Sequence, residues 1–209
     1  ETVMTLSRAA RGQPDAESNW TKIQRDIVRM ELAGARRRRP VARGPLPGKS
    51  NYFLGNRPEQ WRLNVKTYRR LRYEEVYPGI DVLYYGNQRR LEHDFIVAPG
   101  ADPHRIRMRF RGQQAVRVDS AGDLILTLGA AEIRQRKPYA YQESGGKRTE
   151  VSCRYRLDAG GEAGLEVGSY DLNAPLIIDP VVDFATYLGG SGTDAAYGVA
   201  VDSSGNAYL

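Results

Sequence analysis

Apolar and polar residues alternate with a period of two along most of the chain. In residues 27–32, apolar side chains fall at every second position and charged side chains lie between them. The same alternation recurs in residues 105–110, 115–118 and 123–128. Successive side chains of a β-strand point to opposite sides, so this period is typical of strands with one buried face. The pattern predicts sheets with an aliphatic dry face and an arginine-rich wet face.

Short glycine-containing segments separate these runs. Four of them lie between two alternating segments, at residues 86–87, 121–123, 144–146 and 159–161. Glycine, asparagine and aspartate tolerate the positive φ angles of tight hairpin turns, so we predict at least four β-hairpins. A short helix is expected only near residues 16–24. The predicted fold class is all-β, an antiparallel β-sandwich-like domain built from hairpins.

The composition changes after residues 179–180. Residues 175–178 have the apolar character of a buried closing strand, whereas residues 187–192 are dominated by glycine and small polar side chains. This change indicates the start of a second module. The chain is therefore divided into an N-terminal lead segment (1–19), a β-rich domain (20–180) and a further module (181–209).

Composition excludes several kinds of site. The 209 residues are 41% hydrophobic, and no run approaches the ~18 consecutive apolar residues of a membrane span. The chain begins at Glu1 without an apolar signal core, so we expect any export signal to be removed or to lie outside this sequence. The single cysteine, Cys153, excludes an internal disulfide and a cysteine-based zinc site, and its place on an apolar face predicts a buried, unreactive thiol.

The net charge of +6 is concentrated locally. Four arginines precede Pro40 in a segment that continues through residues 44–48, where glycine and proline predict a loop. We interpret this run as solvated, with contact to an anionic surface as the alternative. A nucleic-acid partner is disfavoured, because no helix-turn-helix, zinc or aromatic ribonucleoprotein motif accompanies the charge. The arginines are Arg36, Arg37, Arg38 and Arg39.

The C-terminal module resembles one unit of the bacterial SBBP β-propeller repeat family. The resemblance rests on residues 186–194 and 198–208. Within it, residues 198–201 would form a short inner strand and residues 202–206 a tight turn. The family resemblance implies that the chain ends in a partial propeller blade.

The preceding domain resembles the uncharacterised β-rich domain that usually comes before such repeats. His93 departs from that pattern, where tyrosine is expected. The resemblance implies a large bacterial protein that is exported or attached to the cell surface, and it carries no catalytic residues to transfer. It also implies an unfinished blade, whose final strand would stay unpaired, pair with the preceding domain or pair between molecules, so that self-association is one candidate outcome. The segments that carry the resemblance are residues 51–56, 61, 76–81, 84–87, 91–95, 98–103 and 178–180.

Three acidic residues are candidates for chemistry. Glu92 and Asp94 stand two residues apart in a predicted strand, so both project to one face while His93 projects to the other. Two carboxylates on one face can form an acid–base pair or ligate a metal. With Asp81 they would support the alternative function of an exported carbohydrate-active hydrolase.

We favour a structural interpretation of these acids. On a wet, arginine-rich face, Glu92 and Asp94 would form cross-strand ion pairs. Asp81 follows a Pro-Gly turn, and its carboxylate would fix that turn or pair with an arginine. His93 would be a core residue with a hydrogen-bonded ring nitrogen, and His104 is expected in an exposed turn. The candidate arginine partners of the acids are Arg89, Arg107 and Arg109.

Aromatic side chains crowd one third of the chain. An exposed tyrosine and tryptophan patch beside arginines is typical of sugar- and protein-binding surfaces, whereas tyrosines with hydroxyls at the rim of a core are the ordinary alternative. Adjacent Tyr84 and Tyr85 must point to opposite faces of a strand. The candidate ligand-binding residues are Trp61, Tyr68, Tyr73, Tyr84 and Tyr85.

These observations predict a non-catalytic structural and interaction domain that caps a propeller. The resemblance places it outside the cell or on its surface, with a glycan or another surface protein as the candidate partner. No cofactor and no metal are expected. Residues 202–206 lack the acidic ligand of an EF-hand, and residues 189–192 lack the lysine and helix of a phosphate-binding loop.

Overall fold

A computed structural model describes residues 2–9, 23–87, 90–129, 131–183, 200–201 and 207–208. The described residues form eighteen β-strands and two short 3-10 helices, with no α-helix among them. Every strand pair is antiparallel. The all-β, hairpin-built fold class is therefore confirmed. The 3-10 helices are η1 (Pro58–Gln60) and η2 (Pro103–Arg105).

Sheet A combines the first two strands of the chain with three strands from later in the domain. Its register places Met30 opposite Phe110 and Leu32 opposite Met108, so the apolar faces of both strands coincide. Met108 and Phe110 are buried and their arginine neighbours are exposed, as the alternation predicted. The five strands, in spatial order, are β1 (Thr2–Ala9), β2 (Ile23–Leu32), β7 (Arg107–Arg111), β14 (Ala163–Val167) and β13 (Cys153–Leu157).

Sheet B is the largest sheet and has seven strands. The predicted closing strand lies near its centre, where Leu176 and Ile178 are fully buried, so that prediction is confirmed. The strands, in spatial order, are β12 (Lys147–Val151), β11 (Tyr139–Ser144), β15 (Leu176–Asp179), β6 (Arg90–Val97), β5 (Ile80–Asn87), β4 (Arg62–Tyr77) and β3 (Val41–Tyr52).

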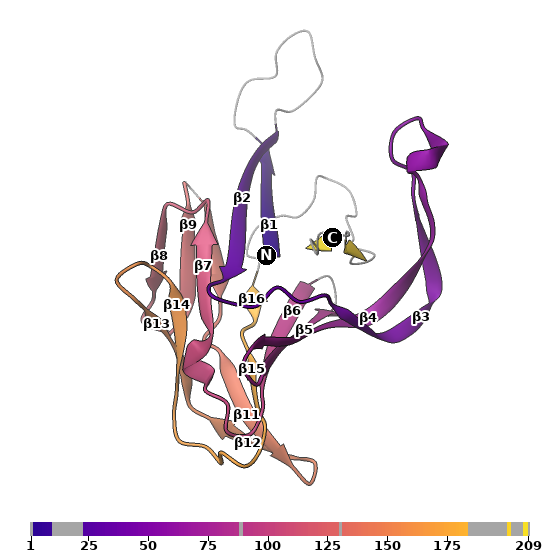
Figure 1. Ribbon diagram of the computed structural model, residues 1–209. Coiled ribbons are helices and arrows are strands. Elements are labelled where there is room, and N and C mark those ends of the chain that lie inside the picture. The colour runs from indigo at the N-terminus through magenta and orange to yellow at the C-terminus, as the bar shows by residue number, and fades with distance from the viewer. Residues whose placement is uncertain are drawn as a thin grey trace.

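The loop predicted for residues 44–48 is wrong, because these residues belong to β3. β3 is the edge strand of sheet B, where a proline can face solvent without removing a ladder hydrogen bond. A register shift between Pro45 and Lys49 absorbs the irregular segment. Beyond the sheet, β3 and β4 continue together as a long two-stranded projection (Figure 1).

Sheet C has four strands and leads to the C-terminal module. Its hairpin β8–β9, together with β5–β6, β11–β12 and β13–β14, confirms the four predicted hairpins. Two further short strands, β17 (Ala200–Val201) and β18 (Ala207–Tyr208), pair with each other. Sheet C comprises β16 (Val182–Asp183), β10 (Ala131–Gln135), β9 (Leu124–Leu128) and β8 (Ala115–Val118).

One hydrophobic core joins the three sheets. Sheet B forms one layer, and sheets A and C form the other (Figure 1). Phe95 from sheet B, Met108 from sheet A and Leu126 from sheet C are all buried within it. Cys153 is also buried, as predicted, and this burial raises the pKa of its thiol to about 12, which disfavours the reactive thiolate.

The helix predicted near residues 16–24 falls mainly outside the described residues. Its last two positions are wrong, because Ile23 and Gln24 pair with Ala9 and Arg8 of β1. The alternation that begins at residue 27 thus extends backward into a longer strand. The division of the chain at residues 19 and 180 stays a prediction.

Candidate functional site

An acidic cluster lies on the face of sheet B that points away from the core. It consists of Glu92, Asp94 and Asp179. In the β5–β6 register Tyr85 stands opposite Glu92, and the β15–β6 pairing brings Asp179 beside Asp94. Alternation along β6 and β15 sends these side chains to the outer face, because their neighbours Phe95 and Ile178 fill the core.

Burial perturbs Asp94 within this cluster. The hydroxyl of Tyr85 donates a hydrogen bond to Asp94 Oδ1 at 2.9 Å. Burial raises the pKa of Asp94, and the charge of Glu92 adds to that effect, while the Tyr85 hydrogen bond opposes it. Burial and the same hydrogen bond raise the pKa of Tyr85, so its hydroxyl stays protonated.

Asp179 is the most perturbed carboxyl group of the cluster. Burial, followed by the charges of Asp94 and Glu92, raises its pKa to about 6, against a smaller opposing effect of Arg148. Its Oδ1 is buried and has no hydrogen-bond partner among the described residues. The Arg148 guanidinium lies 4.4 Å from the centre of the Tyr141 ring, at the border of the cluster.

The predicted ion pairs of Glu92 and Asp94 are wrong for two of the three candidate arginines. Arg107 and Arg109 belong to β7 of sheet A, and both pair with Glu162. The predicted wet face is also wrong for Glu92, whose side chain is only 8% exposed. Strand spacing indicates which residues share a face, but it cannot assign two strands to the same sheet. Arg89 lies outside the described residues.

Asp81 has a structural role, as predicted. Arg72 Nε donates to its Oδ2 at 2.8 Å, and the backbone N–H of Glu75 donates to its Oδ1 at 2.7 Å. Glu75 has a positive φ of 56° at a register shift between β4 and β5. Asp81 therefore holds an irregular turn of backbone and is separate from the acidic cluster.

His93 is buried in the core, as predicted, but one of its ring nitrogens is not satisfied. Its ring stacks on Tyr84 at 5.5 Å and meets the edge of Phe95 at 5.4 Å. Nε2 has no hydrogen-bond partner among the described residues, so the expectation of a hydrogen-bonded ring nitrogen does not hold for this atom. Burial lowers the pKa of His93 to about 4, so the ring is neutral at neutral pH.

The candidate aromatic residues do not form one surface. Tyr73 and Tyr84 pack partly buried against the core, edge to face at 5.7 Å. Tyr85 points to the opposite face and joins the acidic cluster, so the predicted divergence of Tyr84 and Tyr85 is confirmed. Trp61 and Tyr68 lie on the projection of β3 and β4. Binding by any of these residues stays a prediction.

The arginine run lies in an exposed loop before β3, as predicted. Arg36 forms a 3.6 Å ion pair with Glu75, and Arg38 Nε donates to the Glu75 carbonyl oxygen at 3.3 Å. Arg37 and Arg39 are exposed in the same loop. Contact of these arginines with an anionic surface stays a prediction.

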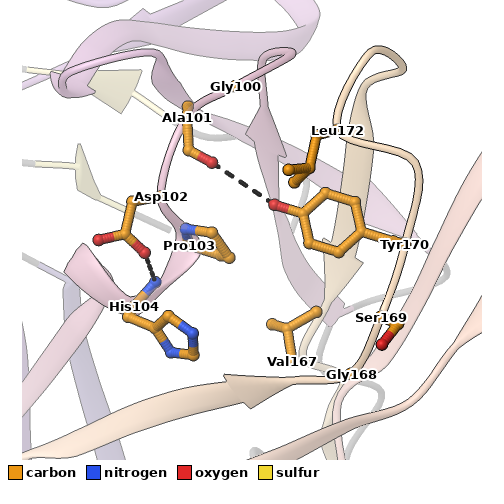
Figure 2. Close-up of a pocket in the computed structure, with 10 residues that line it drawn as sticks. All are labelled: Gly100, Ala101, Asp102, Pro103, His104, Val167, Gly168, Ser169, Tyr170 and Leu172. Atoms are coloured by element: carbon orange, nitrogen blue, oxygen red, sulfur yellow. Dashed lines mark hydrogen bonds between the residues drawn. The ribbon is translucent and has the colours of Figure 1, made fainter.

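A hollow of about 510 Å³ lies elsewhere, between residues 100–104 and 167–172 (Figure 2). The Tyr170 hydroxyl donates to Ala101 O at 3.5 Å, and the His104 backbone N–H donates to Asp102 Oδ1 at 3.0 Å. The first of these hydrogen bonds joins the two loops, and the second lies within the loop of residues 100–104. His104 is exposed, as expected, but the sequence did not indicate that it lines the same hollow as Tyr170, because the two come from separate loops.

The described residues contain no group of three or more histidine, cysteine, aspartate or glutamate side chains arranged to hold a metal ion. None of their helices is long and apolar enough to cross a membrane. The acidic cluster, the hollow and the β3–β4 projection consist of different residues and are three separate features.

The fold defines the chain as an all-β domain that leads through β16 into a further module. Residues 2–181 match the family described as a domain of unknown function (DUF7948), and residues 183–209 match the family described as a beta-propeller repeat (SBBP). The chain therefore belongs to the DUF7948 family and continues into a propeller repeat, which confirms both resemblances. No curated protein and no solved structure matches the chain.

Proposed function

We propose that this domain is a non-catalytic structural and interaction domain of an exported bacterial surface protein, and that it caps the propeller that follows it. The observation that carries the proposal is the junction. The domain match ends at residue 181 and the repeat match begins at residue 183. Val182 and Asp183 form β16, which pairs with Gln135 and Arg134 of β10.

Backbone hydrogen bonds hold the chain at this junction. The backbone N–H of Arg136 donates to the Val181 carbonyl oxygen at 2.8 Å, immediately before β16. A hydrogen-bonded strand therefore lies where the domain match ends and the repeat match begins, which supports a direct connection between the two modules. Because β16 is the edge strand of sheet C, the repeat starts from a sheet edge of the domain.

Ion pairs brace the strand that holds β16. Arg134 Nη1 lies 2.8 Å from carboxylate oxygens of both Asp119 and Asp123. Asp123 also accepts a 2.8 Å hydrogen bond from the backbone N–H of Lys137. Stacked repeats bury their faces against neighbours, so the first repeat needs a cover on its outer side. A braced sheet edge joined directly to that repeat is suited to provide it.

No observation favours the alternative of a carbohydrate-active hydrolase. Asp81 is engaged by Arg72 and by the Glu75 backbone. Glu92 and Asp94 lie on a sheet face and do not line the hollow of Figure 2. Glycoside hydrolysis needs two carboxyl groups that converge on a bound sugar. Binding of a glycan or another surface protein stays a prediction, which a glycan array tests directly.

Inserting four glycine and serine residues after Asp183 is expected to uncouple the domain from the propeller. In a protein that carries the domain and its complete propeller, calorimetry should show one unfolding transition before the insertion and two after it. The propeller transition should fall by at least ~3 °C, because the first repeat loses its cover.

The matched control is the same insertion between Gly145 and Gly146, in the exposed turn of the β11–β12 hairpin. This variant should keep a single transition. Two independent transitions before any insertion, or a junction insertion without effect on the propeller, would contradict the capping proposal.

A further inference from the structure

The longest projection of the domain is a two-stranded ribbon, defined here as residues 41–72. Its strands pair from Val41 opposite Arg72 to Tyr52 opposite Arg62. Outward from Arg70, β3 and β4 pair only with each other among the described strands. Figure 1 shows the ribbon leaving sheet B and extending away from both layers of the core. None of residues 41–72 is among the buried residues of the core, so packing of the core does not explain the length of this projection.

The net positive charge of the protein is concentrated in the ribbon. Its 32 residues contain eight basic side chains and a single acidic one, Glu59, a net charge of +7, whereas the complete chain has a net charge of +6. The rest of the chain is therefore close to neutral. The basic residues are Arg43, Lys49, Arg57, Arg62, Lys66, Arg69, Arg70 and Arg72.

Like charges stand directly opposite each other on one face of the ribbon. Lys49 pairs with Lys66, and Arg43 pairs with Arg70. Opposed like charges destabilise a strand pair. Glu74 lies 3.5 Å from Arg43, but among the described residues neither lysine has a carboxylate at salt-bridge distance. The repulsion between Lys49 and Lys66 is therefore not offset by a carboxylate at salt-bridge distance among the described residues, and a bound anion would reduce it.

The outer end of the ribbon is apolar and exposed. The side chains of Phe53, Leu54 and Leu63 are 63%, 54% and 52% exposed. The end is nevertheless ordered by specific contacts. Trp61 meets Phe53 edge to face at 5.0 Å, and its Nε1 donates to the Gly55 carbonyl oxygen at 3.2 Å. Three large apolar side chains are thus held outward at the tip of a basic shaft.

We propose that the ribbon binds an anionic lipid surface, with Phe53, Leu54 and Leu63 inserted among the acyl chains and the basic shaft on the headgroup phosphates. Apolar side chains at the end of a basic element are the combination that binds such surfaces, because apolar burial and attraction to anionic headgroups add. Trp61 packs on Phe53 at the outer end of the ribbon, and tryptophan is a residue that favours the membrane interface. This contact is separate from the junction with the propeller.

A nucleic acid offers the same negative charge but fits the ribbon less well. Proteins that hold single strands place aromatic rings along a basic groove, where bases stack on them. On the ribbon the exposed tip is largely aliphatic, and Leu54 and Leu63 offer no ring for stacking. Along the shaft, Tyr68 is the exposed aromatic residue of β4. The lipid surface accounts for both the charge and the leucines.

Vesicle binding by the 209-residue chain tests this proposal. The chain should sediment with vesicles that contain about one third phosphatidylglycerol and should bind phosphatidylcholine vesicles at least ~10-fold more weakly. In a Trp20→Phe background, Trp61 is the single tryptophan. Its fluorescence should shift to the blue on binding and be quenched by brominated acyl chains.

Variants separate the two parts of the ribbon. Leu54→Ser with Leu63→Ser should lower vesicle affinity at least ~10-fold, and Lys49→Glu with Lys66→Glu should do the same. The matched control is Leu172→Ser, which removes a leucine that is 60% exposed on a loop beside the hollow of Figure 2. This control should stay within about two-fold of the unmodified chain. Thermal unfolding confirms that each variant is folded.

Three results would overturn the proposal. The first is equal binding to anionic and neutral vesicles, or no binding to either. The second is binding that the ribbon variants leave unchanged, for instance because Arg37→Glu with Arg39→Glu abolishes it instead. The third is competition by a nucleic-acid duplex for the vesicle-binding surface, with the duplex binding equally tightly to the unmodified chain and to the variant in which Leu54 and Leu63 are replaced.

Discussion

Replacing His93 with phenylalanine is expected to remove about 3 kcal/mol of the stability loss between about pH 6.5 and pH 4. The folded pKa of His93 is about 4, below the usual value near 6.5. The unfolded chain therefore binds the proton more readily, and stability that is complete above about pH 6.5 is lost as the pH falls. By about pH 4 this loss amounts to about 3 kcal/mol.

Urea unfolding across this pH range checks the expectation. Phenylalanine keeps the contacts with Tyr84 and Phe95 and has no ring nitrogen to leave unsatisfied. The matched control is His104→Asn, because His104 is the other histidine of the chain and is exposed. This control should follow the pH profile of the unmodified chain. Parallel profiles for the His93→Phe variant and the unmodified chain would falsify the assignment.

Asp179 opposes His93 over the same range and must be separated from it. Its folded pKa of about 6 lies above its usual value, so the folded state binds the proton more readily. Its contribution to stability therefore grows as the pH falls from about 6 to 4. Asp179→Asn should remove that gain, about 1–2 kcal/mol after allowance for its partial exposure. The acid-induced loss of stability should then be steeper than in the unmodified chain.

Replacing Gly112 with alanine is expected to destabilise the domain by at least ~3 kcal/mol. Gly112 follows β7 with a φ of +96°, and an added Cβ would lie 2.1 Å from the Ile27 carbonyl oxygen. The contact is with backbone of β2, so a side-chain rotation cannot relieve it. Relief would require β2 to move away from β7 and would open the core of sheet A.

The matched control for this substitution is Gly146→Ala. Gly146 has a similar φ of +78°, but nothing lies within 4 Å of an added Cβ. Only the backbone strain remains there, about 1–2 kcal/mol. Urea unfolding of both variants at the same pH gives the comparison. Equal destabilisation of the two variants would show that β2 does not approach Gly112 as described.

Local patterns in the sequence predicted the strands and hairpins well. In residues 105–110 and in the turns at 121–123, 144–146 and 159–161, the pattern depends on adjacent residues, and the structure confirms it. The hairpin predicted around residues 86–87 also forms, but Gly86 and Asn87 belong to its strand and pair with Leu91 and Arg90. The same reasoning failed for residues 44–48, where proline and glycine suggested a loop. An edge strand tolerates those residues, and only the neighbouring strands show that β3 is at an edge.

The candidate sites depended on contacts that are distant in sequence. Glu92 and Asp94 were expected beside arginines of β7, but β6 and β7 belong to different sheets. Asp179, which completes the acidic cluster, is more than eighty residues away along the chain. The burial of His93 followed from alternation, whereas its unsatisfied nitrogen depends on which side chains surround it.

Hydrogen exchange at the junction tests the capping proposal most directly. It would be measured on a protein that carries the domain and its complete propeller. If β16 joins the two modules rigidly, the amides of Arg136 and Asp183 should be as protected as those of Ile125 and Leu126 in the middle of sheet C. Exchange of the Arg136 and Asp183 amides at the rate of an unstructured peptide would contradict it, because the propeller would then hang from a flexible linker.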